Sequence, residues 1–273
     1  MQSEQVTTRL NKFISETGIC SRREADRLIE QGQVTVNGQV AETGMKVSNA
    51  DDVVVAGKPL RAKPKAVYLV YHKPVGITCT TDTAVPGNIV DAVNYPARIF
   101  PIGRLDKPSS GLILLTNDGD IVNKILRAGN AHEKEYIVSV DKPVTRGFLE
   151  RMAAGVPILG TVTKPCIVKQ TGSSSFAIIL TQGLNRQIRR MTEFLGYEVT
   201  RLKRIRIMSI QLADLKPGQW REVSNEEFSM LSNLLKDSVK TEEASHGAGA
   251  GIKKRSGHRP RTERPKRQRP PER

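Results

Sequence analysis

The segment at residues 100–118, FPIGRLDKPSSGLILLTND, constrains the fold most strongly. Residues 112–115 are all apolar and turn-forming residues bound them, so they predict a short buried strand. One carboxylate, Asp106, lies between Arg104 and the turn at residues 107–111. An acid at the mouth of a sheet, among basic groups, suits a substrate that carries phosphate. The alternative is that Asp106 only begins a turn, since aspartate hydrogen-bonds the backbone of turns.

Basic charge is spread unevenly along the chain and favours a polyanionic partner. The 273 residues include 43 Lys and Arg against 28 Asp and Glu, a net charge of +15. Residues 1–62 contain equal numbers of basic and acidic side chains, whereas residues 63–238 and 239–273 carry surpluses of 8 and 7 positive charges. A charge of this size says little about the fold but indicates a nucleic acid partner.

The composition argues against a membrane protein and against a disulfide framework. No apolar run approaches the roughly 18 residues of a membrane span, and the first residues lack the apolar stretch of a signal peptide. Cys20, Cys79 and Cys166 are far apart in sequence and lack the spacing of metal ligands. We therefore expect reduced thiols, a cytoplasmic location, no membrane contact and a monomer.

Residues 1–62 predict a small domain of two helices followed by a hairpin. Thr8 is the expected cap of the first helix. Ser21 and Glu24, three residues apart, form the pattern of a capping box for the second helix. Two alternating valines precede Asn37 and Gly38, a dipeptide that is typical of a tight hairpin turn.

Residues 63–238 predict an α+β domain. Short strands rich in Val, Ile and Leu outnumber the helices and often follow one another directly, which favours a mixed, largely antiparallel sheet flanked by helices. Asn185 is the expected N-cap of a helix at residues 185–196. We expect strands at residues 67–73, 98–103, 111–116, 135–140, 166–170, 176–182 and 209–215, and helices at residues 120–129, 145–155 and 185–196.

Residues 239–273 have no apolar periodicity and many prolines and basic residues, so we expect a disordered basic tail. Such a tail is either a solubilising extension or an arm that follows phosphates electrostatically.

Five segments resemble known protein families. The segment GRLDKPSSGLILLTNDG at residues 103–119 resembles the catalytic motif of the RsuA-type pseudouridine synthases. HKPVGITCTT, HEKEYIVSV and QGLNRQIRRM, at residues 72–81, 132–140 and 182–191, are similar to further motifs of the same family, in the same order and spacing. Residues 9–39 are similar to an S4 domain, a small RNA-binding module. The resemblance implies an S4 domain over residues 1–62 and a synthase catalytic domain over residues 63–238.

The resemblance implies that the protein isomerises uridine to pseudouridine in RNA. This reaction breaks the N1–C1′ bond, turns the base and rejoins it through C5. It requires one ionised carboxylate at the sugar, a role that the resemblance gives to Asp106, either as nucleophile or as base. It requires no redox cofactor, no ATP and no obligatory metal, so we expect no cofactor.

The resemblance also implies roles for residues around Asp106. Arg189 would keep the carboxylate ionised, and Ile188 would form an apolar wall against the base. Tyr136 would stack on the extruded base, although a lone strand tyrosine is often a core residue. Arg104 would help to displace the uridine.

Basic residues within residues 1–62 and on the predicted helix at residues 185–196 are candidate RNA contacts. The alternative is an ordinary solvated charged surface. The candidates are Arg9, Lys12, Arg22, Arg23, Arg27, Arg186 and Arg190, with a further strip of Arg201, Lys203, Arg204 and Arg206.

The resemblance favours a uridine in a 23S rRNA stem-loop as the target, with 16S rRNA and tRNA as alternatives. A rival interpretation is a non-catalytic S4-type RNA-binding or ribosome-assembly factor. An S4-linked methyltransferase would require a glycine-rich loop after a strand, which the sequence lacks.

Overall fold

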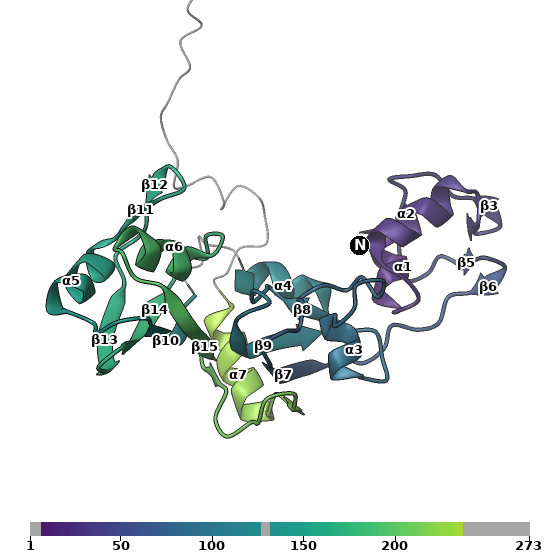
Figure 1. Ribbon diagram of the computed structural model, residues 1–273. Coiled ribbons are helices and arrows are strands. Elements are labelled where there is room, and N and C mark those ends of the chain that lie inside the picture. Colours follow the sequence, from purple (N-terminus) through teal and green to yellow (C-terminus); the bar gives the residue numbers. More distant parts are fainter. Residues whose placement is uncertain (1–6, 127–131, 237–273) are drawn as a thin grey trace, which may run out of the picture.

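The computed structural model describes residues 7–126 and 132–236, which form a small head and a larger body (Figure 1). The head, residues 8–60, lies at one end of the body and has a hydrophobic core of its own. No helix in the described ranges is long and apolar enough to span a membrane. The elements of the head are β1 (Thr8–Arg9), α1 (Leu10–Glu16), α2 (Arg22–Glu30), β2 (Val34–Val36), β3 (Gln39–Val40), β4 (Lys46–Val47), β5 (Val53–Val55) and β6 (Lys58–Pro59).

The head contains the two helices and the hairpin that the sequence predicts, and also β1, β4, β5 and β6, which it does not predict. Arg9, not Thr8, is the N-cap of α1, and both residues belong to the short β1–β4 ladder, Thr8 opposite Val47 and Arg9 opposite Lys46. The Ser21 side chain caps α2 by accepting a hydrogen bond from the backbone N–H of Glu24. The turn between β2 and β3 has positive φ at both central residues, as the Asn-Gly dipeptide predicts.

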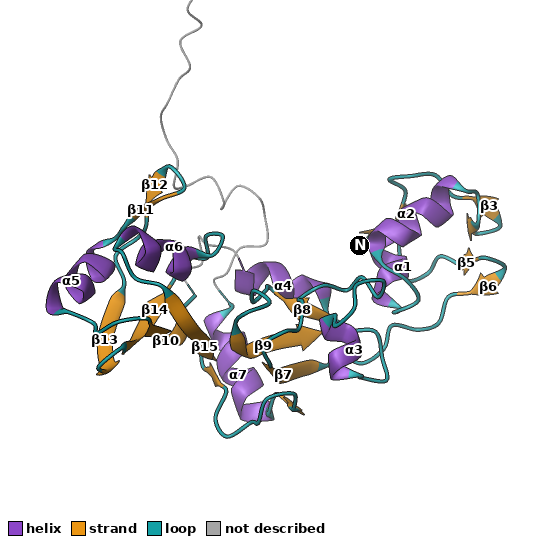
Figure 2. Cartoon of the chain, viewed as in Figure 1, coloured by secondary structure: helices purple, strands orange, loops and turns teal. Residues whose placement is uncertain are grey.

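The body is built on a nine-stranded mixed sheet with helices packed on it (Figure 2). Its strand order is β13-β14-β10-β15-β9-β7-β17, and β16 and β8 pair with β15 and β9. This architecture confirms the predicted α+β class. The elements of the body are β7 (Tyr68–Lys73), α3 (Ile89–Val93), β8 (Phe100–Ile102), β9 (Ser110–Thr116), α4 (Gly119–Leu126), β10 (Lys134–Val140), α5 (Arg146–Ala154), β11 (Pro157–Ile158), β12 (Thr161–Val162), β13 (Ile167–Gly172), β14 (Ser175–Leu180), α6 (Gln187–Phe194), β15 (Val199–Ile207), β16 (Ile210–Gln211), β17 (Trp220–Glu222) and α7 (Asn225–Leu234).

Strand β9 is the buried strand that the apolar run predicts. Leu112 and Leu114 face a cluster that includes residues of α4 and α7, whereas Ile113 and Leu115 face a second cluster that includes α3. Both faces of the strand are therefore covered, which explains why its sequence is continuously apolar rather than alternating.

The two halves of the sheet join where β9 and β15 run parallel. Only a short stretch of register connects them, with Lys203 opposite Ser110 and Arg204 opposite Gly111. Gly111 has φ +112°, and a Cβ at this position would lie 2.2 Å from the carbonyl oxygen of Arg204. The glycine of the Lys-Pro-Ser-Ser-Gly turn therefore allows the two backbones to meet directly behind the loop that carries Asp106.

Several elements of the body were not predicted from the sequence. Helix α7 begins with a complete capping box formed by Ser224 and Glu227 and is absent from the helices expected above. Helix α3 has one and a half turns, too few for a periodic pattern. In the range 209–215, which we expected to be a strand, only β16 is a strand.

The domain boundary between residues 62 and 63 stays a prediction. The head elements end at Pro59 and the sheet of the body begins at Tyr68, with an irregular segment between them. The predicted tail, residues 239–273, lies outside the described residues.

Replacement of Gly111 by alanine should destabilise the protein by about 3 kcal/mol, because the added Cβ clashes with the Arg204 backbone and the φ is unfavourable for any other residue. The free energy of unfolding from urea denaturation measures this loss. Gly147→Ala is the matched control: Gly147 lies in α5 with no atom within 4 Å of a built Cβ, so this change should be neutral or slightly stabilising. Equal stabilities of the two variants would contradict the close approach of β9 and β15.

Candidate active site

A cavity of about 400 Å³ lies over the junction of the two sheet halves. Its walls come from the loop at residues 103–109, from β10 and β15, and from α6 with the segment before it. All five residues that the sequence places at the catalytic centre line it. They are Arg104, Asp106, Tyr136, Ile188 and Arg189.

The loop that carries Asp106 is fixed by backbone hydrogen bonds. The N–H of Ser109 donates to the carbonyl of Asp106 at 2.9 Å, and the N–H of Gly76 donates to the carbonyl of Lys107 at 2.9 Å. The N–H of Leu105 contacts the sulfur of Cys79 at 3.3 Å. The Asp106 side chain is 36% exposed, so the carboxylate is held in place and still accessible to a substrate.

Arg186, not Arg189, forms the ion pair with Asp106, with a distance of 3.6 Å from Nη1 to Oδ2. The guanidinium of Arg189 instead donates to the carbonyls of Val199 and Pro108 and to the hydroxyl of Ser109. Burial and the charge of Arg186 lower the pKa of Arg189, and the Asp106 carboxylate opposes this shift. Arg189 therefore acts on Asp106 at longer range and holds the catalytic loop by hydrogen bonds.

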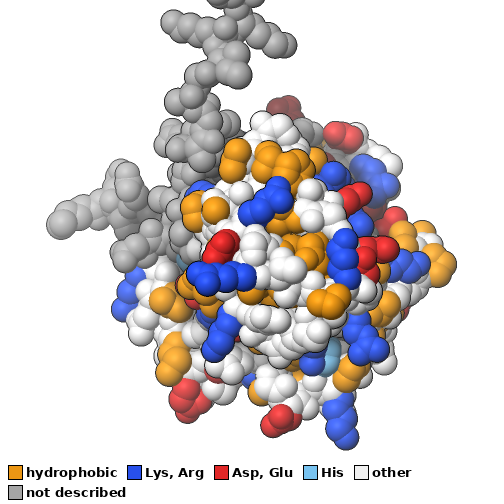
Figure 3. All heavy atoms as spheres, turned by 60° about the vertical axis from the view of Figure 1, so that its left-hand side comes forward, with side chains coloured by type: hydrophobic (Ala, Val, Ile, Leu, Met, Phe, Trp, Pro, Cys, Tyr) orange, Lys and Arg blue, Asp and Glu red, His pale blue; other side chains and the backbone are white. Residues whose placement is uncertain are grey.

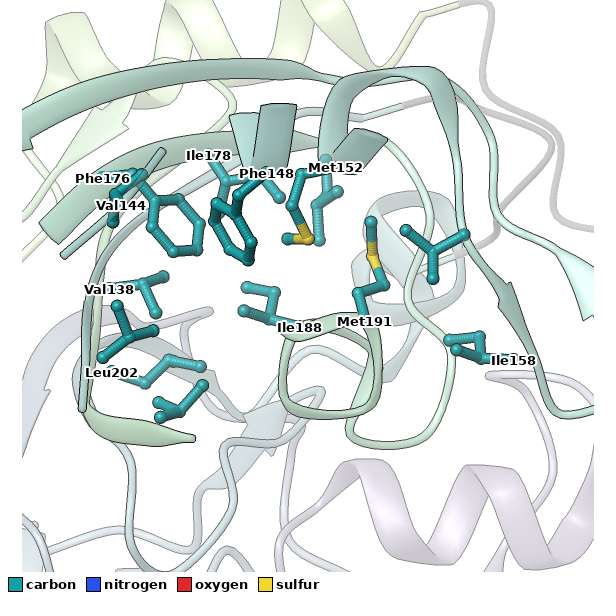
Figure 4. Packing of buried hydrophobic residues seen from close by; sticks show 14 residues of the cluster. Val138, Val144, Phe148, Met152, Ile158, Phe176, Ile178, Ile188, Met191 and Leu202 are labelled. Atoms are coloured by element: carbon teal, nitrogen blue, oxygen red, sulfur yellow. The ribbon is translucent and has the colours of Figure 1, made fainter. Parts of the chain in front are cut away.

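Helix α6 places Arg189 toward the loop by burying its opposite side. Figure 4 shows Ile188 and Met191 pointing into the cluster that contains Phe148 and Met152. The N-cap of α6 is Arg186, with φ +50°, and not Asn185 as predicted.

Asn185 lies one residue before the N-cap and contacts Arg190. The Nε of Arg190 donates to the backbone carbonyl of Asn185 at 3.1 Å, and its Nη2 donates to the side-chain oxygen at 3.3 Å.

Tyr136 faces the cavity beside a buried arginine. It lies opposite Arg204 in the β10–β15 ladder, and the Arg204 guanidinium is 6.0 Å from the centroid of its ring. Arg204 is 4% exposed and its Nε donates to the carbonyl of Leu112 at 2.7 Å. The expectation that Arg204 belongs to an exposed phosphate-binding strip is therefore wrong.

The neighbouring arginine of that strip is also engaged within the protein. The guanidinium of Arg206 lies 2.8 Å from the carboxylate of Glu135 and 3.0 Å from that of Glu133. Strand β15, residues 199–207, is not evident from the sequence, because it is rich in basic residues and a β-bulge interrupts its alternation. Leu202 and Arg204 face the cavity, whereas Arg206 lies on the other face with Lys203.

Lys73 and His72 support the site from beneath without reaching the cavity. Lys73 is fully buried, and its amine donates to the carbonyls of Pro74 and Ile77. Burial lowers the pKa of Lys73, while the charges of Cys79 and Asp106 oppose this shift. Burial also lowers the pKa of His72, whose Nδ1 lies 2.6 Å from the carbonyl of Leu215. Both residues therefore have structural partners.

The predicted RNA contacts of the head have different environments. Lys12 lies 2.7 Å from Asp120 of the body and 3.4 Å from Glu16, so it joins the head to α4. Arg27 pairs with Glu24. Arg9, Arg22 and Arg23 are exposed, and their contact with RNA stays a prediction.

On the face of the body seen in Figure 3, Lys and Arg side chains are spread between uncharged surface and apolar patches, rather than gathered in one patch. Cys20, Cys79 and Cys166 form no disulfide.

Comparison with known proteins identifies the family. The RNA pseudouridylate synthase family matches residues 67–194 and the S4 domain family matches residues 8–54. The dual-specificity RNA pseudouridine synthase RluF of Salmonella typhi is 55% identical over 91% of this chain and 88% of its own, and its Escherichia coli K12 counterpart is 54% identical over 91% and 87%. The ribosomal large subunit pseudouridine synthase B of Bacillus subtilis is 35% identical over 89% and 99%.

A solved pseudouridylate synthase aligns with a TM-score of 0.61 and 29% identity over 82% of this chain and 99% of that one. The chain belongs to the RNA pseudouridine synthases that carry an N-terminal S4 domain. It is an RNA-modifying isomerase, which rules out the non-catalytic alternative. Within the family, the segment RAGNAHEKEY at residues 127–136 resembles that of ribosomal large subunit pseudouridine synthase F, in agreement with the similarity to RluF.

Replacement of Arg189 by lysine should lower the single-turnover rate about a hundredfold. Lysine keeps the charge but cannot bridge Val199 on one side and Pro108 and Ser109 on the other, so the loop with Asp106 should shift. Tritium release from uridine labelled at C5 measures the rate. Arg151→Lys, on the exposed side of α5, should keep the full rate. A fully active Arg189→Lys enzyme would show that charge alone suffices.

Proposed function

We propose that this protein converts a uridine to pseudouridine in a stem-loop of 23S rRNA and that tRNA is a second substrate. The observation that carries this proposal is the convergence of the motif residues on one cavity, with the Asp106 carboxylate accessible at its wall. The similar proteins named for the large ribosomal subunit support an rRNA substrate, and those named for dual specificity support a second RNA substrate. A cytoplasmic location and a monomeric state are part of the same proposal.

Asp106 is the catalytic carboxylate in this proposal. The target base enters the cavity, the ring of Tyr136 stacks on it, and Ile188 forms the apolar wall. Stacking on an aromatic ring restores about 1–3 kcal/mol that a base loses when it leaves an RNA helix. The exposed Arg104 at the mouth contacts the RNA backbone and helps to extrude the nucleotide.

The carboxylate acts at the sugar while the base turns. As the N1–C1′ bond breaks, Asp106 either bonds to C1′ or takes the neighbouring C2′ proton. Arg186 places a positive charge 3.6 Å from the carboxylate, which both routes require in its ionised form. The hydrogen bonds of Arg189 keep the loop from moving during this step.

The head recognises the shape of a folded RNA near the target. Its exposed arginines, Arg9, Arg22 and Arg23, surround two short helices and suit contacts to the backbone of an RNA helix. Arg186 and Arg190, near the cavity, extend the basic surface to the phosphates on either side of the target uridine.

Replacement of Asp106 by asparagine should reduce isomerisation below about 1% of wild type, which corresponds to a barrier higher by about 2.7 kcal/mol or more, because an amide can neither attack C1′ nor accept a proton there. RNA affinity should change little. Tritium release from C5 measures turnover, and filter binding measures affinity. Asp82→Asn is the control, because Asp82 is an exposed turn residue that should not affect the rate. Turnover of Asp106→Asn above 1% would contradict the assignment.

A strain that lacks this protein should lose pseudouridine at one or more positions in 23S rRNA and in tRNA. Chemical mapping of pseudouridine across all rRNA and tRNA species of wild-type and deletion strains tests this directly. Complementation with the Asp106→Asn variant should leave those positions unmodified. Loss confined to 16S rRNA would contradict the proposed substrate.

A further inference from the structure

Two cations, the half-buried Lys134 and the buried Arg204, line the cavity on the sheet face that carries Tyr136. Lys134 precedes Tyr136 by two positions on β10, and both line the cavity, whereas Glu135 between them faces the opposite side and pairs with Arg206. Arg204 lies opposite Tyr136 on β15 and also lines the cavity.

Neither cation contacts a carboxylate within the described ranges. The amine of Lys134 donates to the carbonyl of His132 at 3.2 Å. Arg204 donates to the carbonyls of Leu112 and Arg104, and its buried Nη2 has no hydrogen-bond partner among the described residues. Buried charges without a counterion are costly, so the cavity favours a ligand that becomes negative inside it. Burial, assisted by the charge of Arg204, lowers the pKa of Lys134 to about 8.

In the proposed reaction, the anion that forms inside the cavity, beside Tyr136, is the detached base and not a phosphate. The exposed Arg104 and the half-exposed Arg186 at the rim are the groups available to the RNA backbone. The base lies against Tyr136, beside Lys134. Uracil enters as a neutral group, but cleavage of the N1–C1′ bond leaves the electron pair on N1, and the negative charge spreads to the O2 and O4 carbonyl oxygens.

We propose that Lys134 is a further catalytic residue, whose ammonium group donates a hydrogen bond to a carbonyl oxygen of uracil and stabilises the anion formed when the N1–C1′ bond breaks. Arg204 adds to the positive field beneath the base. This inference rests on the proposed role of Asp106 at the sugar.

The atoms balance without any further reactant. C1′ bonds to the Asp106 carboxylate, or the carboxylate takes the C2′ proton and returns it later. The base turns and the C5–C1′ bond forms, which in the first route breaks the bond between C1′ and the Asp106 carboxylate. The C5 proton then passes to solvent and N1 takes up a proton. Lys134 keeps its proton throughout.

Several charged groups surround Lys134 and must be considered in a pH test. The charge of Arg204 on β15 lowers the pKa of Lys134, and Glu133 and Glu135 are its neighbours in sequence. The other charged or titratable groups that line the cavity are Arg104, Asp106, Tyr136, Arg186 and Arg189. Those elsewhere on or beside the surrounding elements α4, α6, β10 and β15 are Asp120, Lys124, His132, Arg190, Glu193, Arg201, Lys203 and Arg206.

The first test replaces Lys134 by methionine, which keeps the length and apolar bulk of the side chain. We expect the single-turnover rate on a C5-tritiated 23S rRNA transcript to fall about a hundredfold, as for the loss of one donor to a developing oxyanion. The dissociation constant for the RNA should stay within about twofold, because the anion exists only after bond cleavage. Lys169→Met, an exposed strand lysine on β13, is the control and should keep the full rate.

Two outcomes of this first test would overturn the inference. One is a rate within about threefold of wild type. The other is a loss that lies entirely in RNA affinity, which would make Lys134 a contact of the bound ground state.

The second test uses pH and the variant Lys134→Arg. Because the amine is protonated below a pKa of about 8, the wild-type rate should be highest below that pH and should fall as pH rises through it. Arginine stays charged over this range, so Lys134→Arg should keep at least a tenth of the rate and lose the fall above pH 8. A basic limb that persists unchanged in this variant would overturn the inference.

Thermal melting of each variant at each pH separates catalysis from unfolding, and Lys134→Arg supplies the answer if Lys134→Met does not fold. Failure of the function is distinguishable from failure of this inference. Wild-type enzyme that releases no tritium from any rRNA or tRNA would refute the proposed function. Active wild type with an equally active Lys134→Met variant would refute only the role of Lys134.

Discussion

The parallel contact between β9 and β15 is the constraint on which the rest of the body depends. On one side lie the strands β13, β14 and β10, and on the other lie β7, β8 and β17. The two sides meet at Gly111 and Arg204, where only a residue without a side chain lets the backbones approach. The cavity lies over this junction, so one wall comes from each half of the sheet. A shift at the junction would separate Asp106 from Tyr136.

Arginine side chains hold this junction from two directions. Arg204 donates across it to the carbonyls of Leu112 and Arg104, and Arg189 donates to the carbonyl of Pro108. A planar guanidinium can satisfy carbonyls on separate segments at once, which an ammonium group cannot do with a fixed geometry. The catalytic loop is therefore positioned by long-range contacts rather than by its own turn alone.

Sequence reasoning predicted the parts of the site that depend on local pattern. The apolar run of β9, the turn with Asp106 and the family motifs together indicated which residues meet at the cavity. It could not distinguish Arg186 from Arg189 as the partner of Asp106, because that depends on the left-handed backbone at Arg186 and on where Arg189 finds carbonyls. It also mistook Arg204 for a surface residue, because a buried cation has no signature in one sequence. The sequence also does not mark Lys134 as a cavity residue, because its alternation with Tyr136 shows only that the two share a face of β10.

The contact between the head and the body affects how firmly the distance between the head and the cavity is fixed. Lys12 and Asp120, which form one link between them, are both partly exposed, with side chains 26% and 42% accessible. Ion pairs of this kind contribute about 0–1 kcal/mol and weaken as salt rises. The segment between the last head strand and β7 contains no helix or strand. If the head binds an RNA helix as proposed, the distance from that helix to a uridine in the cavity is consequently adjustable at small energetic cost. RNAs with different spacings between these two points can then share one catalytic cavity.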